Sequence, residues 1–246
     1  MGAAEVTAVV LAVLLGGLIK SITGMGFPIV AIPVIAVVLS LEDAVAIIAI
    51  PNTIFNASLV FQARSAAPET RDLPRLAAYG IVGAVGGTLL LFSVPEAALL
   101  IPLIVMIWVY IISAQQNPTR QLTPAHTRRW APAVGTAAGV AQGAVGISGP
   151  IVGAWIHAYR LPKQAAVLSV TVLFLLTGAA QLVVLVAAGS YDRDRLLLAV
   201  LAIIPMAITL PIGVRIRDRI STDAFGRAVL GILALSSIAL TYRVLA

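Results

Sequence analysis

Lys20 is the residue of this chain whose type and position most clearly suggest chemistry. It is one of two lysines among the 246 residues, and it lies in an apolar segment four residues before Gly24. An ionisable group inside an apolar segment of membrane length is costly and marks a functional site by default. We expect the Lys20 ammonium to contribute to an anion-binding site. The alternative is that its side chain extends from a helix end to the lipid headgroups.

Glycine and proline interrupt the apolar sequence twice, at two places 122 residues apart. These residues allow a helix to stop, turn and restart. A restarted helix presents free N–H groups and the positive end of its dipole, which together bind anions. The alternative is that the glycines only permit close helix packing. The first break comprises Thr23, Gly24, Met25, Gly26, Phe27 and Pro28, and the second break comprises Gly146, Ile147, Ser148, Gly149 and Pro150.

Four amide side chains inside apolar segments are further candidates for substrate contacts. Asn52 and Asn56 are spaced i, i+4 and therefore share a helix face. Gln142 lies 122 residues after Lys20, at the matching position of the second half, and Gln181 follows in a later segment. We expect these amides either to line the substrate site or to hold neighbouring helices together.

The positions of the acidic residues indicate the sign of the substrate's charge. All ten lie at segment ends or in loops, whereas cation transporters and many proton-coupled pumps carry carboxylates within the membrane. Together with Lys20, this distribution favours an anionic substrate. No HExxH, P-loop or GxSxG motif is present, and the chain has no cysteine. We therefore expect no enzyme activity, no cofactor and no metal site.

The composition is that of an integral membrane protein. Hydrophobic residues make up 60% of the chain, charged residues only 11%, and the mean hydropathy is +1.05. Soluble domains carry about 25% charged residues. The net charge of +6 comes from basic residues in loops between apolar segments, so we expect no nucleic-acid binding. The N-terminus lacks a basic region and carries Glu5, so we expect no cleaved signal peptide.

The apolar segments divide into two groups of five. A transmembrane helix needs roughly 20 residues, and two segments, 27–40 and 149–159, are shorter than this. Each short segment therefore forms either a half-crossing helix or part of a bent hairpin. We predict a first transmembrane repeat at 1–114, a cytoplasmic linker at 115–131 and a second repeat at 132–246. The segments cover 4–22, 27–40, 44–63, 74–93, 97–114, 132–145, 149–159, 164–189, 195–213 and 224–245.

Five is an odd number, so the second repeat enters the membrane from the opposite side and the repeats are inverted. The positive-inside rule orients them. The loops 64–75, 115–131, 160–163 and 214–223 contain eleven basic residues, against three on the other side. Both termini should therefore face outward. Gly83, Gly86 and Gly87 are expected to support either internal packing or a homodimer contact.

The two breaks, their repetition after a basic linker and the chain length resemble the sulfite exporter TauE/SafE family of membrane permeases. The resemblance covers essentially the whole chain and extends to 4-toluene sulfonate uptake permeases. It rests on the segments Gly24-Met25-Gly26-Phe27-Pro28 and Gly146-Ile147-Ser148-Gly149-Pro150. It implies an all-α polytopic protein of the bacterial inner membrane that moves small sulfur oxyanions or organosulfonates. The first break is less glycine-rich than in many members, with Thr23 and Met25 where glycine would be unsurprising.

The leading hypothesis is therefore a secondary transporter that exports sulfite or an organosulfonate such as sulfoacetate by alternating access. An uptake permease for thiosulfate or sulfate is the alternative, and an anion channel is a third interpretation. The expected partners are the small anionic substrate and the lipid bilayer.

Overall fold

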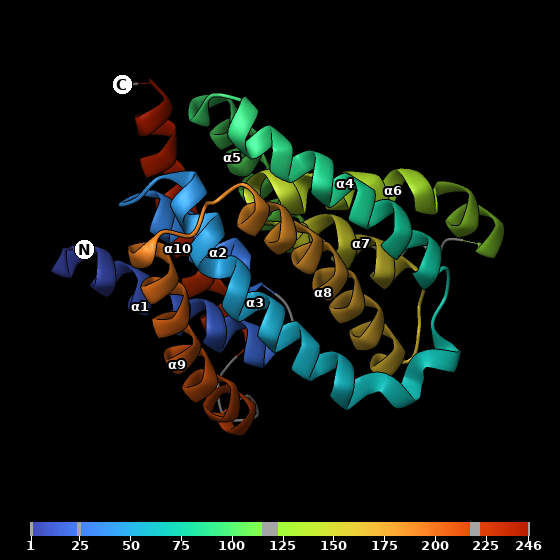
Figure 1. The fold of residues 1–246 in the computed structure, drawn as a ribbon. Coiled ribbons are helices and arrows are strands. Elements are labelled where there is room, and N and C mark those ends of the chain that lie inside the picture. Colours follow the sequence, from blue (N-terminus) through green and yellow to red (C-terminus); the bar gives the residue numbers. More distant parts are fainter. Residues whose placement is uncertain (1, 24–25, 115–122, 217–221, 246) are drawn as a thin grey trace. The chain divides into compact units, whose positions relative to one another are not determined.

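The structure is a computed structural model that describes residues 2–23, 26–114, 123–216 and 222–245. Within these ranges every regular element is a helix (Figure 1). Gly24, Met25 and residues 115–122 of the predicted linker lie outside them. The elements are α1 (Ala3–Thr23), α2 (Phe27–Ala36), α3 (Leu41–Ala63), the 3₁₀ helix η1 (Arg64–Glu69), α4 (Leu73–Ser93), α5 (Glu96–Ala114), α6 (Pro124–Val145), α7 (Gly149–Ala158), α8 (Lys163–Ala187), α9 (Arg193–Ile216) and α10 (Thr222–Leu245).

Several of the described helices have the length and composition of membrane helices. Four described stretches are long and apolar enough to cross a membrane, namely Ala4–Ser21, Leu41–Glu69, Leu73–Ser93 and Lys163–Ala187. The prediction of an all-helical membrane protein is thus confirmed. The helices α2 and α7 contain only ten residues each. At 1.5 Å per residue each is about 15 Å long, half of the roughly 30 Å hydrocarbon core, so neither crosses the membrane alone.

The chain forms two compact units, and each takes segments from both halves of the sequence. The first unit contains Met1–Pro51, Val94–Gln115 and Gly189–Ala246, and the second contains Asn52–Ser93 and Gln116–Ala188. Helix α3 begins in the first unit and ends in the second. The two compact units therefore do not coincide with the predicted repeats 1–114 and 132–246.

In the first unit, α1 packs against α2 and α9, and α10 packs against α2 and α5. Two adjacent glycines of α1 make these contacts close. A Cβ atom at Gly16 would lie 2.8 Å from the carbonyl oxygen of Phe27, and one at Gly17 would overlap the hydroxyl of Thr209. Helix α2 therefore lies directly on the backbone of α1, and eight of its ten residues are buried.

Arg195 joins the beginnings of α3 and α9 in the same unit. Its guanidinium lies 2.6 Å from Asp43 Oδ1 and 2.7 Å from Glu42 Oε1, and it also donates to the carbonyl oxygen of Ser190 at 2.8 Å. The backbone N–H of Leu41 donates to Glu96, the first residue of α5, at 2.8 Å. The ends of three helices are thereby held together.

In the second unit, α4 packs against α6 and α8, and α7 packs against α6 and α8. The α4–α6 contact runs along glycines on both helices, as in close membrane helix pairs. A Cβ atom at Gly83 or Gly87 would overlap the backbone of α6, whereas one at Gly86 would meet nothing within 4 Å. Gly83 and Gly87 thus serve internal packing, and a homodimer contact stays a prediction.

Candidate functional site

The first break lies in the first unit, where α1 ends at Thr23 and α2 begins at Phe27. Gly26 precedes α2 with a φ of 100°, a left-handed conformation that glycine adopts without strain. Pro28 occupies the first turn of α2, and no side chain caps that helix. Of the break residues, Gly24, Met25 and the side chain of Thr23 lie outside what the structure describes.

Lys20 lies in the last turn of α1, just before this break. Its side chain is buried, with a relative exposure of 3%. A lysine that reached the lipid headgroups would be exposed at the protein surface. The burial therefore favours a role for Lys20 inside the protein.

Tyr110 is a second polar residue beside the first break. A Cβ atom built on Gly26 would lie 4.0 Å from the Tyr110 hydroxyl oxygen and 3.1 Å from Ile19 Cγ2. Tyr110 belongs to α5, far from the break in sequence, and no local pattern connects the two. Sequence reasoning therefore missed it.

The second break lies in the second unit, where α6 ends at Val145 and α7 begins at Gly149. Gly146 ends α6 with a φ of 71°, and its N–H donates to the carbonyl oxygen of Gln142 at 2.9 Å. Ile147 and Ser148 are buried and non-helical. Pro150 occupies the first turn of α7, where its missing N–H removes no helical hydrogen bond.

Three buried side chains form a hydrogen-bond network at this break. Ser148 donates to Gln142 Oε1 at 2.9 Å, and Gln142 Nε2 donates to Gln181 Oε1 at 3.1 Å. Gln142 Nε2 also donates to the carbonyl of Gly146 at 3.3 Å, and Gln181 Nε2 to the carbonyls of Gln142 and Gly143 at 2.7 and 3.2 Å. The network ties α6 to α8. Of the two interpretations of these amides, the geometry favours helix–helix attachment.

Asn52 and Asn56 form a separate pair on α3. Asn56 Nδ2 donates to Asn52 Oδ1 at 3.1 Å, and both side chains are buried. The i, i+4 spacing thus places them on one face, as expected. The neighbouring Thr53 is directed towards α8, because a Cβ atom at Gly178 would lie 3.5 Å from its hydroxyl oxygen.

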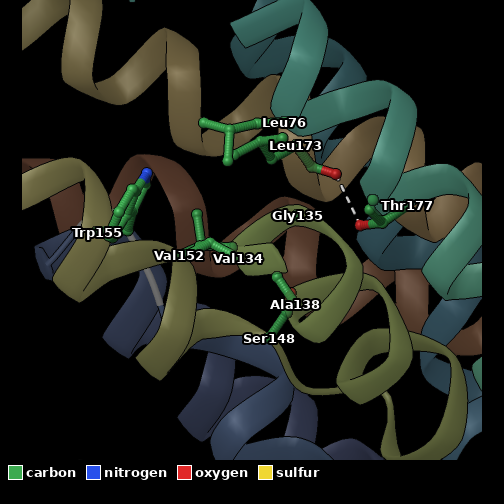
Figure 2. Close-up of a pocket in the computed structure, with 10 residues that line it drawn as sticks. Leu76, Val134, Gly135, Ala138, Ser148, Val152, Trp155, Leu173 and Thr177 are labelled. Carbon is green, nitrogen blue, oxygen red and sulfur yellow. Dashed lines mark hydrogen bonds between the residues drawn. The ribbon is translucent and has the colours of Figure 1, made fainter. Parts of the chain in front are cut away.

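A small pocket adjoins the second break in the second unit (Figure 2). Its walls are apolar apart from a few polar groups, among them Ser148, Thr177 and the indole of Trp155. Thr177 donates to the carbonyl oxygen of Leu173 at 2.7 Å, the bond drawn in Figure 2. The lining residues are Leu76, Gly80, Val134, Gly135, Ala138, Ser148, Val152, Trp155, Leu173 and Thr177. Among the predicted site residues that the structure describes, Ser148 alone lines this pocket.

Comparison with known proteins identifies the family. The model of the sulfite exporter TauE/SafE family matches residues 9–240, nearly the whole chain. The chain belongs to this family. No curated protein and no solved structure matches it. The resemblance inferred from the two breaks is therefore confirmed, and membership in the TauE/SafE family makes this chain an exporter-type membrane transporter rather than an enzyme.

Within this TauE/SafE protein the two breaks offer different chemistry. The buried Lys20 side chain comes shortly before the first break in the sequence, and the Tyr110 phenol lies beside Gly26. The second break has neutral side chains whose hydrogen bonds join two helices. No group of three His, Asp or Glu side chains in the described ranges is arranged to hold a metal ion. A buried basic side chain thus accompanies the first break, and buried amides accompany the second.

Proposed function

We propose that this protein is a secondary transporter that exports a small sulfur-containing anion, sulfite or an organosulfonate such as sulfoacetate, by alternating access. Family membership supports an exporter-type transporter. The observation that carries the finer proposal is the burial of Lys20 in the last turn of α1, four residues before Gly24 of the first break. In its protonated form this side chain would attract an anion held at the helix start that follows it in the sequence.

The start of α2 supplies the second attraction for the anion. Its first-turn N–H groups have no cap from a side chain at Gly26, and they carry the positive end of the helix dipole. Gly26 has no side chain, so a ligand can approach the backbone closely. We assign substrate binding to Lys20 and the backbone of the first break. At the second break we assign it to the backbone of 146–150, because the Gln142 and Gln181 side chains are engaged with α6 and with each other.

The inverted repeat is part of the same proposal, and helix packing supports it. In the first unit, α9 of the second half packs against α1 of the first half. In the second unit, α4 of the first half packs against α6 of the second half. Two related repeats that exchange their fourth helices would produce this reciprocal pattern. The broken-helix arrangement is also typical of transporters that bind substrate near the membrane midplane.

The proposal also includes the orientation of the protein in the membrane and the force that drives the anion out. The loops rich in arginine face the cytoplasm of a bacterial inner membrane, and both termini face outward. A negative interior favours the exit of an anion by about 2.3 kcal/mol per charge per 100 mV. Export therefore needs no separate coupling ion. Uptake of thiosulfate or sulfate would require a proton or sodium gradient, and an anion channel would show flux that does not saturate.

The test is thermal unfolding of the purified protein in detergent with sulfite, sulfate, thiosulfate, sulfoacetate, taurine and acetate. A ligand that binds the folded state raises the unfolding temperature in a saturable way. We expect sulfite or sulfoacetate to do so, and Lys20→Met to weaken the apparent affinity by about tenfold or more, as expected for the loss of one charged hydrogen bond. Lys163→Met is the matched control, because this other lysine is exposed at the start of α8.

Each outcome has a distinct meaning. Retained affinity in Lys20→Met removes the role of this residue, and no response to any anion removes the proposed function. In proteoliposomes, efflux that saturates with substrate and follows the membrane potential supports export. A requirement for an imposed proton or sodium gradient favours the uptake alternative.

A further inference from the structure

The pocket beside the second break is narrow in this structure. Its interior has room for about one water molecule. A sulfonate or sulfite ion is larger than this, so the pocket admits a solute only if a wall moves. Ser148, which belongs to the second break, lines the pocket directly. An opening of this wall would therefore expose the second break.

Two walls of the pocket are fixed by backbone contacts. Gly80 on α4 and Gly135 on α6 both line it. A Cβ atom at Gly135 would lie 2.6 Å from the carbonyl oxygen of Leu76, and one at Gly139 would overlap the carbonyl of Gly80. Helices in such contact cannot separate without losing the contact along their whole length. Opening must therefore involve another wall.

Helix α7 forms another wall of the pocket. It has ten residues, follows the non-helical residues 147–148, and contributes Val152 and Trp155 to the pocket. A Cβ atom at its first residue, Gly149, would meet nothing within 4 Å. Trp155 is the largest side chain on this wall.

A series of two hydrogen bonds begins at the indole nitrogen of Trp155. The indole Nε1 donates to the Tyr159 hydroxyl at 2.8 Å, and that hydroxyl donates to Asp72 Oδ2 at 3.4 Å. The Arg71 guanidinium lies 5.5 Å from the centre of the Tyr159 ring. The series connects α7 to the segment between η1 and α4, which belongs to the same unit.

The backbone has an unusual conformation at both ends of this hydrogen-bond series. Asp72 has a φ of 54° and Arg160, next to Tyr159, has a φ of 52°. Left-handed conformations are rare for residues other than glycine and are concentrated at functional and switch sites. Two of them flank a single hydrogen-bond series here.

We propose that Trp155 is the movable wall of this pocket and that Tyr159 is the positioning residue that holds it closed. The proposal rests on the proposed transport function, because a transporter must open and close the space around its substrate. When the Trp155–Tyr159 bond breaks, the indole is free to rotate away from the pocket lining and the pocket opens. Tyr159 acts only through Trp155 and does not contact the substrate.

The test measures how fast a thiol reagent reaches the pocket. The chain has no cysteine, so Ala138→Cys places a single thiol on the pocket lining. The purified protein in detergent is labelled with a charged methanethiosulfonate. Adding Tyr159→Phe keeps the ring and removes the hydroxyl. We expect labelling about tenfold faster, the effect of one hydrogen bond on an opening equilibrium. Trp155→Phe, which removes the donor, should accelerate labelling similarly.

Two controls separate opening of the pocket from general loosening. Tyr79→Phe, an exposed tyrosine on α4, should leave the rate unchanged. Ser169→Cys places the thiol on α8, fully buried and outside the pocket, and Tyr159→Phe should not accelerate its labelling. Equal rates with and without Tyr159→Phe at Ala138→Cys, or equal acceleration at Ser169→Cys, overturn the proposal.

The measurement needs neither anion binding nor flux. A protein that binds no anion yet shows the selective acceleration overturns the proposed function and leaves the movable wall in place. A protein that binds sulfite but shows unchanged labelling rates overturns the movable wall and leaves the proposed function in place.

Discussion

Gly139 of α6 lies directly against the carbonyl oxygen of Gly80 of α4, so closely that a Cβ atom at position 139 would overlap it. The same relation recurs along the pair, because Cβ atoms at Gly83, Gly87 and Gly143 would also overlap the opposite backbone. Helix α6 leads into the second break and carries Gln142. The α4–α6 contact is therefore the support on which that part of the site is built.

Gly139→Ala is expected to destabilise the protein by about 1–3 kcal/mol, because the added methyl group forces two backbones apart. Thermal unfolding in detergent measures this. Gly86→Ala is the matched control on α4, where a Cβ atom meets nothing within 4 Å. It should be neutral or stabilising by up to about 1 kcal/mol, since alanine is the better helix former. Equal unfolding temperatures for the two variants would contradict the packing described.

Arg195→Gln is expected to loosen the first unit. The change removes the ion pairs to Glu42 and Asp43 and leaves two neighbouring carboxylates without their cation. Because the three side chains are partly exposed, we expect a loss of about 1–3 kcal/mol that shrinks at high salt. Unfolding temperatures at low and high ionic strength measure both effects. Arg193→Gln changes an exposed arginine two residues away and should have little effect at either salt concentration. A salt-independent difference would argue against an ionic cause.

Hydropathy and composition were sufficient to predict an all-helical membrane protein, because a bilayer imposes length and polarity on each segment separately. The family was also predictable, because the residues that indicate it are local runs around Gly26 and Gly149. Neither inference requires knowledge of which helices touch.

The contacts between helices were not predictable in the same way. Gln181 meets Gln142 across 39 positions of sequence, and Tyr159 meets Asp72 across 87. Such pairs depend on the packing of α4 against α6 and α8, and a single sequence carries no periodic signal for that packing. For the same reason, the sequence left two interpretations of the amides open and did not single out Tyr110.

Gln181→Leu distinguishes the two interpretations of the amide network. Leucine has a similar size and removes both the acceptor of Gln142 Nε2 and the donor to two backbone carbonyls. Leaving buried polar groups without partners costs about 1–3 kcal/mol. We therefore expect a lower unfolding temperature with an unchanged affinity for sulfite or sulfoacetate, measured by thermal shift in the same preparation.

The control for that variant is Gln164→Leu, which alters an exposed glutamine at the start of the same helix and should change neither quantity. If Gln181→Leu lowers anion affinity while the unfolding temperature is retained, the amides bind substrate and helix attachment is not their main role. If it lowers stability alone, the network is the means by which α6 and α8 hold the second break in place. Substrate recognition there then belongs to the backbone of 146–150.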